Sequence, residues 1–268
     1  MAVLTLTAMG LWFIMSGDSQ STESLKWLQL VQTLATFALP PVLGAWLWSE
    51  GHKPFAWLKL NVGMSWQTAV FAIAIMCCAI PAINLLADLN SRVVLPESLD
   101  FIEQILRQQE EAAAALTERF LQADTIGMLF VNIGLMALLP AFAEELSFRG
   151  TLQQIGRSSH VAIWLTAFIF SAIHMQFYGF IPRMLMGAMF GYMLVWTGSL
   201  WVPVLMHFTN NGIAVVVYYL TADSAQKDAI KTNWADTIGA GSMWWLGVLS
   251  LILTFLGLLI FARRTRTQ

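Results

Sequence analysis

Two adjacent carboxylates, Glu144 and Glu145, follow a stretch, residues 125–143, that contains no Asp, Glu, Lys or Arg. Ionisable side chains at membrane depth are costly, and by default they mark a functional site. On a helix, Glu145 and Arg149 share one face four residues apart with the acid first, the favourable order for an ion pair. Glu144 points about 100° away and is left without that partner. The alternative is that all three are ordinary solvated charges at the membrane edge.

Two histidines and an amide interrupt the apolar sequence in the same way. His174 ends the segment FSAIH, and His207 precedes Asn211 by four residues in HFTNN, so one helical face presents an imidazole and an amide. Hydrogen bonds between helices would explain these residues without any chemistry. Because three separate helices each contribute a polar group, we instead expect the groups to converge on one site.

Distances along the predicted helices indicate whether these groups can meet. Glu144 and His174 lie about 18 Å and about 22 Å from the turn near residues 156–159, at about 1.5 Å per residue, so they can face each other. His207 lies only about 12 Å from the turn near Ser199. That turn must sit deeper in the membrane, or the helix must tilt, to bring His207 to the same depth.

A carboxylate, two imidazoles and an amide inside a membrane suit the hydrolysis of an acyl bond. A general base activates water, and polar donors stabilise the oxyanion. The sequence has no G-x-S-x-G, no H-E-x-x-H and no pair of intramembrane aspartates, so serine-elbow, zincin and aspartyl sites lack their residues. Water is therefore the expected nucleophile.

The order of these motifs resembles the CPBP family, the CAAX-protease and bacteriocin-processing intramembrane proteases that are also called the Abi family. Its three signature motifs occur in order within residues 125–220: Glu144-Glu145-x-x-x-Arg149, Phe170-x-x-x-His174 and His207-x-x-x-Asn211. The resemblance implies an eight-helix architecture and an endopeptidase whose site lies within the membrane. It also implies that Glu145 and Arg149 form a supporting ion pair.

The same resemblance implies a role for each remaining polar residue of the motifs. It makes Glu144 the general base and His174 its partner in activating a water molecule. It makes His207 and Asn211 the donors that hold the oxyanion.

Cofactor and substrate stay open at the level of the sequence. Glu144, His174 and His207 could supply the three protein ligands of an open zinc site, and a metal-free glutamate mechanism is the alternative. The family includes CAAX endopeptidases, processors of bacteriocin and pheromone peptides, and members credited with immunity or scaffolding. We expect a membrane-associated protein or peptide as substrate. The rival interpretations are a non-catalytic immunity or accessory protein and a proton-coupled transporter.

The composition predicts an all-α, polytopic membrane protein. The chain has 268 residues, of which 57% are hydrophobic and 11% charged, and its mean hydropathy is +0.66. A spanning helix needs about 20 mostly apolar residues. Eight spans are predicted in the charge-free stretches 1–17, 27–48, 60–87, 125–143, 158–182, 184–222 and 237–262, with two in 184–222 that break near residues 197–199. A net charge of -2 leaves no basic face for nucleic acid.

No linker or repeat divides the chain, so we expect one membrane domain, residues 1–268, with its catalytic core in 125–220. The polar insertion 88–124 repeats apolar residues at near-helical spacing, which predicts an amphipathic helix over the bundle. The basic C-terminal residues and the positive-inside rule predict that both termini are cytoplasmic and the insertion is outside. The small size and the lack of extra domains look bacterial, so we expect a multi-pass protein of a bacterial plasma (inner) membrane. The GxxxG of Gly187 and Gly191 predicts close internal helix packing.

Overall fold

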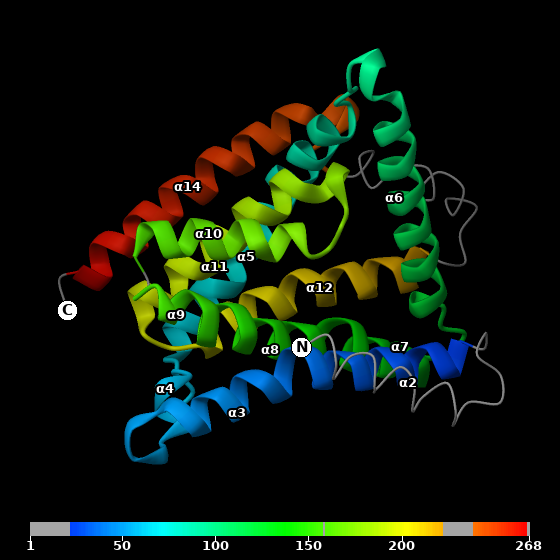
Figure 1. Ribbon diagram of the computed structural model, residues 1–268. Helices are drawn as coiled ribbons and strands as arrows, with labels where there is room; N and C mark the ends of the chain where they lie inside the picture. The colour runs from blue at the N-terminus through cyan, green and yellow to red at the C-terminus, as the bar shows by residue number, and fades with distance from the viewer. Residues whose placement is uncertain (1–21, 158, 222–237, 267–268) are drawn as a thin grey trace.

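The computed structural model describes residues 22–157, 159–221 and 238–266, and the regular elements of these segments are all helices. This confirms the predicted all-α class (Figure 1). The main α-helices are α2 (Thr22–Thr33), α3 (Leu39–Trp48), α4 (Pro54–Trp57), α5 (Trp66–Ser91), α6 (Asp100–Leu121), α7 (Ile126–Asn132), α8 (Leu139–Ser147), α9 (Gln153–Ile155), α10 (His160–Ala172), α11 (Phe180–Thr197), α12 (Trp201–Thr221) and α14 (Trp244–Arg266). Short π- and 3-10-helical turns join several of them.

Five continuous helical segments of the described residues are long and apolar enough to cross a membrane: Thr22–Trp48, Trp66–Ser91, Ile126–Ile155, Phe177–Thr197 and Gly241–Thr265. The protein is therefore a multi-pass membrane protein. The predicted count of eight spans is not confirmed, because α10 is a shorter apolar helix and the predicted first span, residues 1–17, lies outside the described residues. The break predicted near residues 197–199 is present, since Gly198 ends α11 with a left-handed φ of 66°.

Two predicted boundaries are wrong. The helix that begins at Ile126 does not end at residue 143 but continues to Ile155, so Glu144 and Glu145 lie inside a spanning segment rather than at its end. The predicted span 158–182 is divided, because α10 ends at Ala172 and α11 starts only at Phe180. His174 consequently lies in the turn between these two helices.

Wide π-helical turns accommodate prolines in two of the spanning segments. The turn η4 (Ile133–Leu138) ends two residues before Pro140, and η1 (Leu34–Ala38) ends two residues before Pro40. A proline lacks the N–H group and its ring clashes with the preceding turn of an α-helix. A wider turn relieves that clash, and π-turns of this kind are frequent near functional sites.

The helix α5 is completed by a side chain from α14, which packs along it. Pro81 interrupts the hydrogen bonds of α5, and the Ser250 hydroxyl of α14 fills the gap. This hydroxyl donates to the carbonyl of Cys78 and accepts from the amide of Ala82 at 3.0 Å. Within a bilayer such a partner must come from the protein, because no water is available to supply it.

The predicted amphipathic helix is present as α6, which lies across the ends of α12 and α7 (Figure 1). Its apolar face, however, does not cover the bundle: Phe101, Ile105 and Leu116 are exposed, and the buried residues of the helix are Phe120 and Leu121 at its end. The side that faces the protein carries Glu110, whose carboxylate accepts a hydrogen bond from Gln176. The apolar side of α6 therefore points outward.

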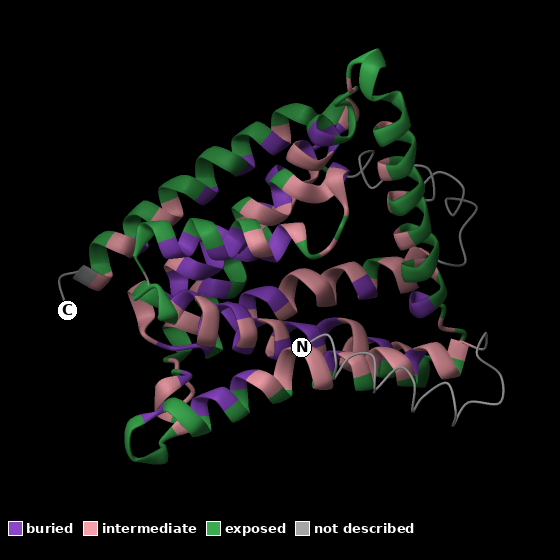
Figure 2. Ribbon diagram, viewed as in Figure 1, coloured by how far each residue is buried: buried purple, intermediate pink, exposed green. Residues whose placement is uncertain are grey.

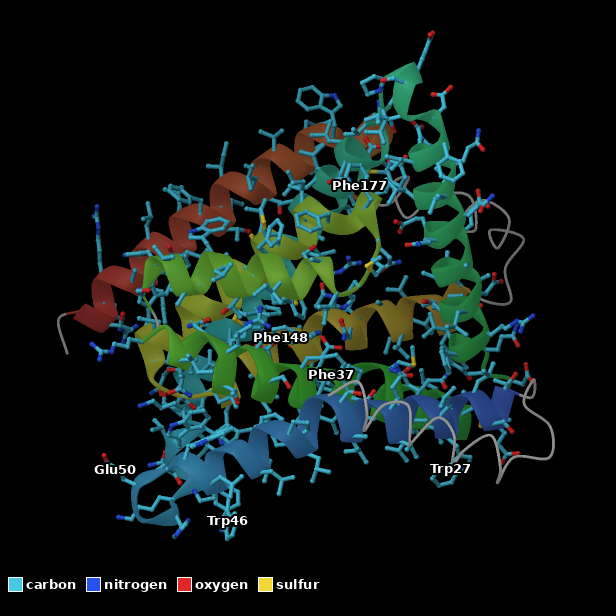
Figure 3. All side chains as sticks on the ribbon, viewed as in Figure 1. Trp27, Phe37, Trp46, Glu50, Phe148 and Phe177 are labelled. Atoms are coloured by element: carbon cyan, nitrogen blue, oxygen red, sulfur yellow. The ribbon has the colours of Figure 1, made fainter. Side chains whose placement is uncertain are left out.

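The outer surface of the bundle is far more apolar than that of a water-soluble protein. The outer faces of α14 and α3 are exposed and largely apolar, whereas buried residues gather in α8, α10, α11 and α12 (Figure 2). Trp46 and Glu50 project from one end of the bundle, while Phe148 lies inside it (Figure 3). The most deeply buried side chains include Glu145 and Arg149, both 0% exposed. Charged side chains are thus buried inside the bundle.

We expect α6 and the end of α14 to lie on opposite sides of the membrane, because Figure 1 places them at opposite ends of the bundle. In a variant without Cys77 and Cys78, a membrane-impermeant maleimide should label Gln108→Cys in intact cells. Lys53→Cys, near the end occupied by the C-terminus of α14, should react only after permeabilisation. The reverse labelling pattern would contradict the predicted orientation.

Candidate active site

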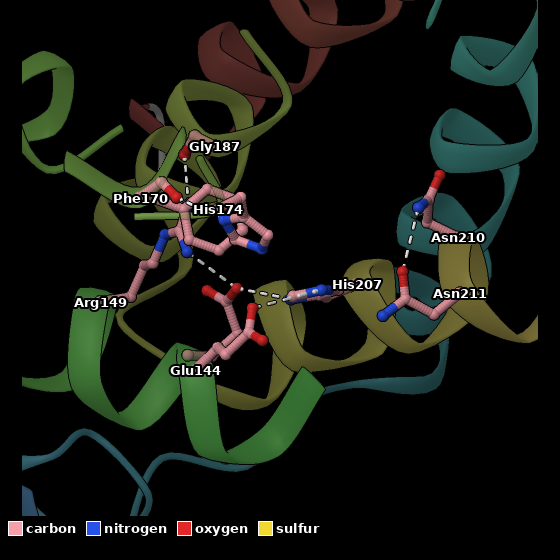
Figure 4. A network of polar contacts seen from close by, with 9 residues as sticks. Glu144, Arg149, Phe170, His174, Gly187, His207, Asn210 and Asn211 are labelled. Atoms are coloured by element: carbon pink, nitrogen blue, oxygen red, sulfur yellow. Dashed lines mark hydrogen bonds and ion pairs between the residues drawn. The ribbon is translucent and has the colours of Figure 1, made fainter. Parts of the chain in front are cut away.

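The centre of the site is one oxygen atom of Glu145 that accepts two hydrogen bonds. Its Oε1 lies 2.9 Å from Nη1 of Arg149 and 2.9 Å from Nδ1 of His207 (Figure 4). Glu145 and Arg149 are four residues apart with both side chains 0% exposed, which confirms the ion pair predicted from their spacing. Because the ion pair also holds His207, it joins the helix of the two glutamates to α12.

Glu144 lies in a different environment from its neighbour. Its side chain is 15% exposed, and its Oε2 is 3.9 Å from Nε2 of His207. That separation exceeds the length of a hydrogen bond between these atoms. Glu144 is therefore the carboxylate of the pair that a water molecule or a substrate can approach.

The imidazole of His207 is fixed on both sides. A carboxylate can only accept hydrogen bonds, so Nδ1 of His207 carries the proton that Glu145 accepts, and Nε2 is directed toward Glu144. The ring stacks on Phe190 with centroids 5.4 Å apart and meets Phe170 edge-on at 6.0 Å. The tautomer and the orientation of His207 are thus determined by its surroundings.

The structure also explains how His207 reaches the depth of the glutamates. The turn between α11 and α12 lies inside the protein, with Ser199 and Leu200 almost fully buried. The hydroxyl of Ser199 donates to the carbonyl of Val62, and the amide of Leu200 donates to the carbonyl of Lys59. The buried turn is thus held against residues 59–62, and His207 reaches the glutamates from it.

His174 stands beside this centre, in the turn after α10. Its Nδ1 donates to the carbonyl of Phe170 at 2.7 Å, which leaves Nε2 as the free ring nitrogen. The ring of Phe170 lies 5.0 Å from that of His174 and 6.0 Å from that of His207, so it contacts both imidazoles. The ionic contact of Glu144 is made with His207 rather than with His174.

Asn211 lies one helical turn beyond His207 on α12. Figure 4 shows it farther from Glu144 than His207 is, with its Oδ1 accepting a hydrogen bond from Asn210 at 3.1 Å. Its own amide donors remain directed away from that bond. Asn211 therefore lies on the same helix as His207 but makes no hydrogen bond to either glutamate among the described residues.

Aromatic rings and the carbonyl of one glycine position the buried arginine. The guanidinium of Arg149 lies 4.6 Å from the ring centroid of Phe170 and 5.5 Å from that of Phe190, and it donates to the carbonyl of Gly187 at 2.9 Å. One turn on, the carbonyl of Gly191 accepts a hydrogen bond from Gln153. This confirms the internal close packing predicted for the GxxxG.

We expect Gly187→Ala to lower the free energy of unfolding by about 1–3 kcal/mol, the typical cost of overfilling a packed core. A Cβ at Gly187 would lie 3.0 Å from Nη2 of Arg149 and 3.2 Å from the ring of Phe170. Gly134→Ala is the matched control, since its Cβ would meet nothing within 4 Å. Equal unfolding curves for the two variants in detergent would contradict the packing argument.

The predicted zinc ligands are not arranged as a ligand set. Within the described segments, no group of three or more His, Cys, Asp or Glu side chains is placed to hold a metal ion. Nδ1 of His207 donates to Glu145, which leaves Nε2 directed toward Glu144, and Phe170 packs against both histidines. Since no contact joins His174 to Glu144 or His207 in the described segments, the three side chains do not form a ligand set there. The metal remains a prediction.

Sequence reasoning missed several residues that shape this site. Phe170 and Phe190 carry no polar signal, although Phe170 belongs to one of the motifs. Gln176 and Arg183 were not connected with each other, because seven residues separate them and no helical repeat spans the turn. In the structure, Arg183 donates to Gln176 at 2.7 Å beside His174.

Comparison with known proteins gives one family match and one similar protein. A family model described as type II CAAX prenyl endopeptidase Rce1-like matches residues 126–213, the segment that contains all of the site residues above. The "Uncharacterized protein YpbD" of Bacillus subtilis (strain 168) is 38% identical over 86 residues, which are 31% of this chain and 43% of that protein. The matched segment thus spans less than half the length of this relative. No solved structure matches the chain.

Proposed function

We propose that this chain, which carries the Rce1-like segment of the CPBP family, is an intramembrane endopeptidase that hydrolyses a membrane-associated protein or peptide. The Rce1-like match implies CAAX-protease-type intramembrane proteolysis. The observation that supports the mechanism most directly is the placement of a half-buried carboxylate, Glu144, opposite Nε2 of a histidine whose other nitrogen is fixed by Glu145.

Glu144 is the general base in this proposal. The 3.9 Å between its Oε2 and Nε2 of His207 is too long for a direct hydrogen bond, but it suits two groups that both contact one water molecule. Glu144 takes a proton from that water as the oxygen attacks the peptide carbonyl. The carboxyl group then delivers the proton to the leaving amine.

His207 and Asn211 stabilise the oxyanion in the proposed reaction. Since Nδ1 of His207 already donates to Glu145, donation from Nε2 requires a second proton on the ring. With two ionised glutamates, Arg149 and a doubly protonated His207, the four side chains have a net charge of zero. Charged donors pre-positioned in a water-poor site are an effective form of oxyanion stabilisation.

His174 retains a role beside the base. Its Nδ1 is committed to the carbonyl of Phe170, so Nε2 offers a lone pair toward the site. We propose that this nitrogen accepts a hydrogen bond from the water or from the substrate amide, which orients it for attack. Contact with Phe170 keeps the two imidazoles at a fixed spacing.

The function is tested by comparing the peptides and membrane proteins of cells that express either the wild-type protein or Glu144→Gln. Fragments with new termini that occur only with the wild type would identify the substrate and support the proposal. Identical fragment profiles, together with a full rescue of the deletion phenotype by Glu144→Gln, would contradict it and favour a non-catalytic accessory role.

A further inference from the structure

Arg183, in the first turn of α11, has a hydrogen-bond donor that the protein leaves unused. Its Nη2 donates to Oε1 of Gln176 at 2.7 Å. Its Nη1 is shielded from solvent and has no hydrogen-bond partner among the described residues. A buried donor without a partner is costly, and the cost is greater when the group is charged.

The guanidinium of Arg183 is held against the turn that carries His174, through its hydrogen bond to Gln176. It is within electrostatic reach of both Glu144 and His174. The turn that carries His174 also carries Gln176, so the residue that fixes Arg183 belongs to the same segment as a proposed catalytic residue. A substrate that contacts His174 therefore passes close to Arg183.

The orientation of Arg183 is set by a chain of contacts that begins on α6. Oε1 of Glu110 accepts a hydrogen bond from Nε2 of Gln176 at 3.3 Å, and Oε1 of Gln176 accepts from Arg183. The side-chain amide of Gln176 thus donates to the carboxylate of Glu110 and accepts from the guanidinium of Arg183. This pairing holds Nη2 in place and leaves Nη1 to point elsewhere.

The other arginine of the site provides a contrast. Arg149 is paired with Glu145, donates to the carbonyl of Gly187 and lies against aromatic rings, so its position is explained by the protein itself. Among the described residues, no carboxylate is in direct contact with Arg183. An oxygen atom brought by a ligand would satisfy Nη1, and a planar guanidinium is well suited to a carboxyl group.

We propose that Nη1 of Arg183 binds an acceptor oxygen of the substrate peptide. This oxygen belongs either to the C-terminal carboxylate or to a backbone carbonyl on the C-terminal side of the cleaved bond. Arg183 would then determine which end of the peptide enters beside His174. The inference rests on the proposed endopeptidase function.

The test measures binding in the Glu144→Gln background, where a peptide can bind without being cleaved. The probes are a fluorescent S-farnesylated CAAX peptide with a free C-terminus and the same peptide with a C-terminal amide, titrated against protein in nanodiscs by fluorescence anisotropy. We expect Arg183→Gln to weaken binding of the free-acid peptide by about 10- to 100-fold, as for loss of a charged hydrogen bond.

The two peptides separate the two sources of the oxygen atom. If Arg183 binds the terminal carboxylate, amidation weakens binding to the parent protein but not to Arg183→Gln. If it binds a backbone carbonyl, Arg183→Gln weakens both peptides equally. Arg183→Lys retains the charge and should lose less affinity, and it serves as the second variant should Arg183→Gln fold poorly.

Arg92→Gln is the matched control, since Arg92 pairs on its own helix with Asp88 and should not affect binding. Unchanged affinity of Arg183→Gln for both peptides overturns the inference. Failure of both peptides to bind the parent protein also counts against it. The proposed function is judged separately, by the membrane fragments that depend on Glu144.

Discussion

Replacement of Glu144 by Gln is expected to lower the turnover of peptide-bond hydrolysis by about 10²- to 10⁴-fold, the usual loss when a general base is removed. The amide keeps the size of the side chain and its ability to form hydrogen bonds, but it cannot take a proton from water. Glu144 is not part of the buried ion pair, so the fold and the binding of substrate should be retained. Turnover is measured with purified protein in liposomes and a substrate identified from the membrane fragments.

Glu50→Gln is the matched control for this substitution, because Glu50 is an exposed glutamate at the far end of α3 (Figure 3). It should cleave as the wild type does. Melting curves recorded for both variants show whether any loss of turnover reflects unfolding. Wild-type turnover in Glu144→Gln would mean that another residue acts as the base.

Glu145→Gln is expected to destabilise the protein by about 3–5 kcal/mol, because it leaves the charge of Arg149 buried without its partner. Both side chains of this ion pair are fully buried. The same substitution weakens the acceptor for Nδ1 of His207, so activity should fall as well. The free energy of unfolding is measured by titration with denaturing detergent.

An exposed ion pair with the same spacing supplies the control. Glu103 and Arg107 are also four residues apart, but Arg107 is 45% exposed, so Glu103→Gln should cost far less stability than Glu145→Gln. The neighbouring amide of Leu95 can still donate to the glutamine oxygen. A loss of stability in Glu145→Gln no larger than that in Glu103→Gln would contradict the proposed role of the buried pair.

A double variant separates stability from catalysis. Replacing both Glu145 and Arg149 with Met removes the two buried charges together, which is often neutral for folding or even stabilising. We expect the double variant to unfold at a higher detergent fraction than Glu145→Gln. It should nevertheless remain inactive, because His207 has lost the carboxylate that fixes its tautomer.

The sequence was sufficient to predict the local pairs of this protein. The spacing of Glu145 and Arg149 predicted their ion pair, and the T-G-S segment predicted the turn at Gly198, where a positive φ suits a residue without a side chain. These features depend on neighbours within one or two helical turns. A short stretch of sequence is therefore enough to predict them.

Long-range contacts explain what the sequence could not predict. The span predicted from the sequence ends before the first charged residue, Glu144. The helix continues in the structure because Arg149 and Gln153 donate hydrogen bonds to the carbonyls of two glycines of α11. The sequence also could not predict that the apolar face of α6 points outward. Hydrophobic periodicity shows that a helix has an apolar face, but it does not show what that face contacts. The contact of Arg183 with Gln176 depends on how the chain turns after α10.

The hydroxyl of Ser250 has a consequence for how the chain is assembled in the membrane. Ser250 ties α14 to α5 across a sequence separation of 168 residues, because its hydroxyl contacts the carbonyl of Cys78 and the amide of Ala82 beside Pro81. These contacts can form only after α14 has been synthesised. We therefore expect the proline-containing part of α5 to reach its final packing late, when α14 joins it.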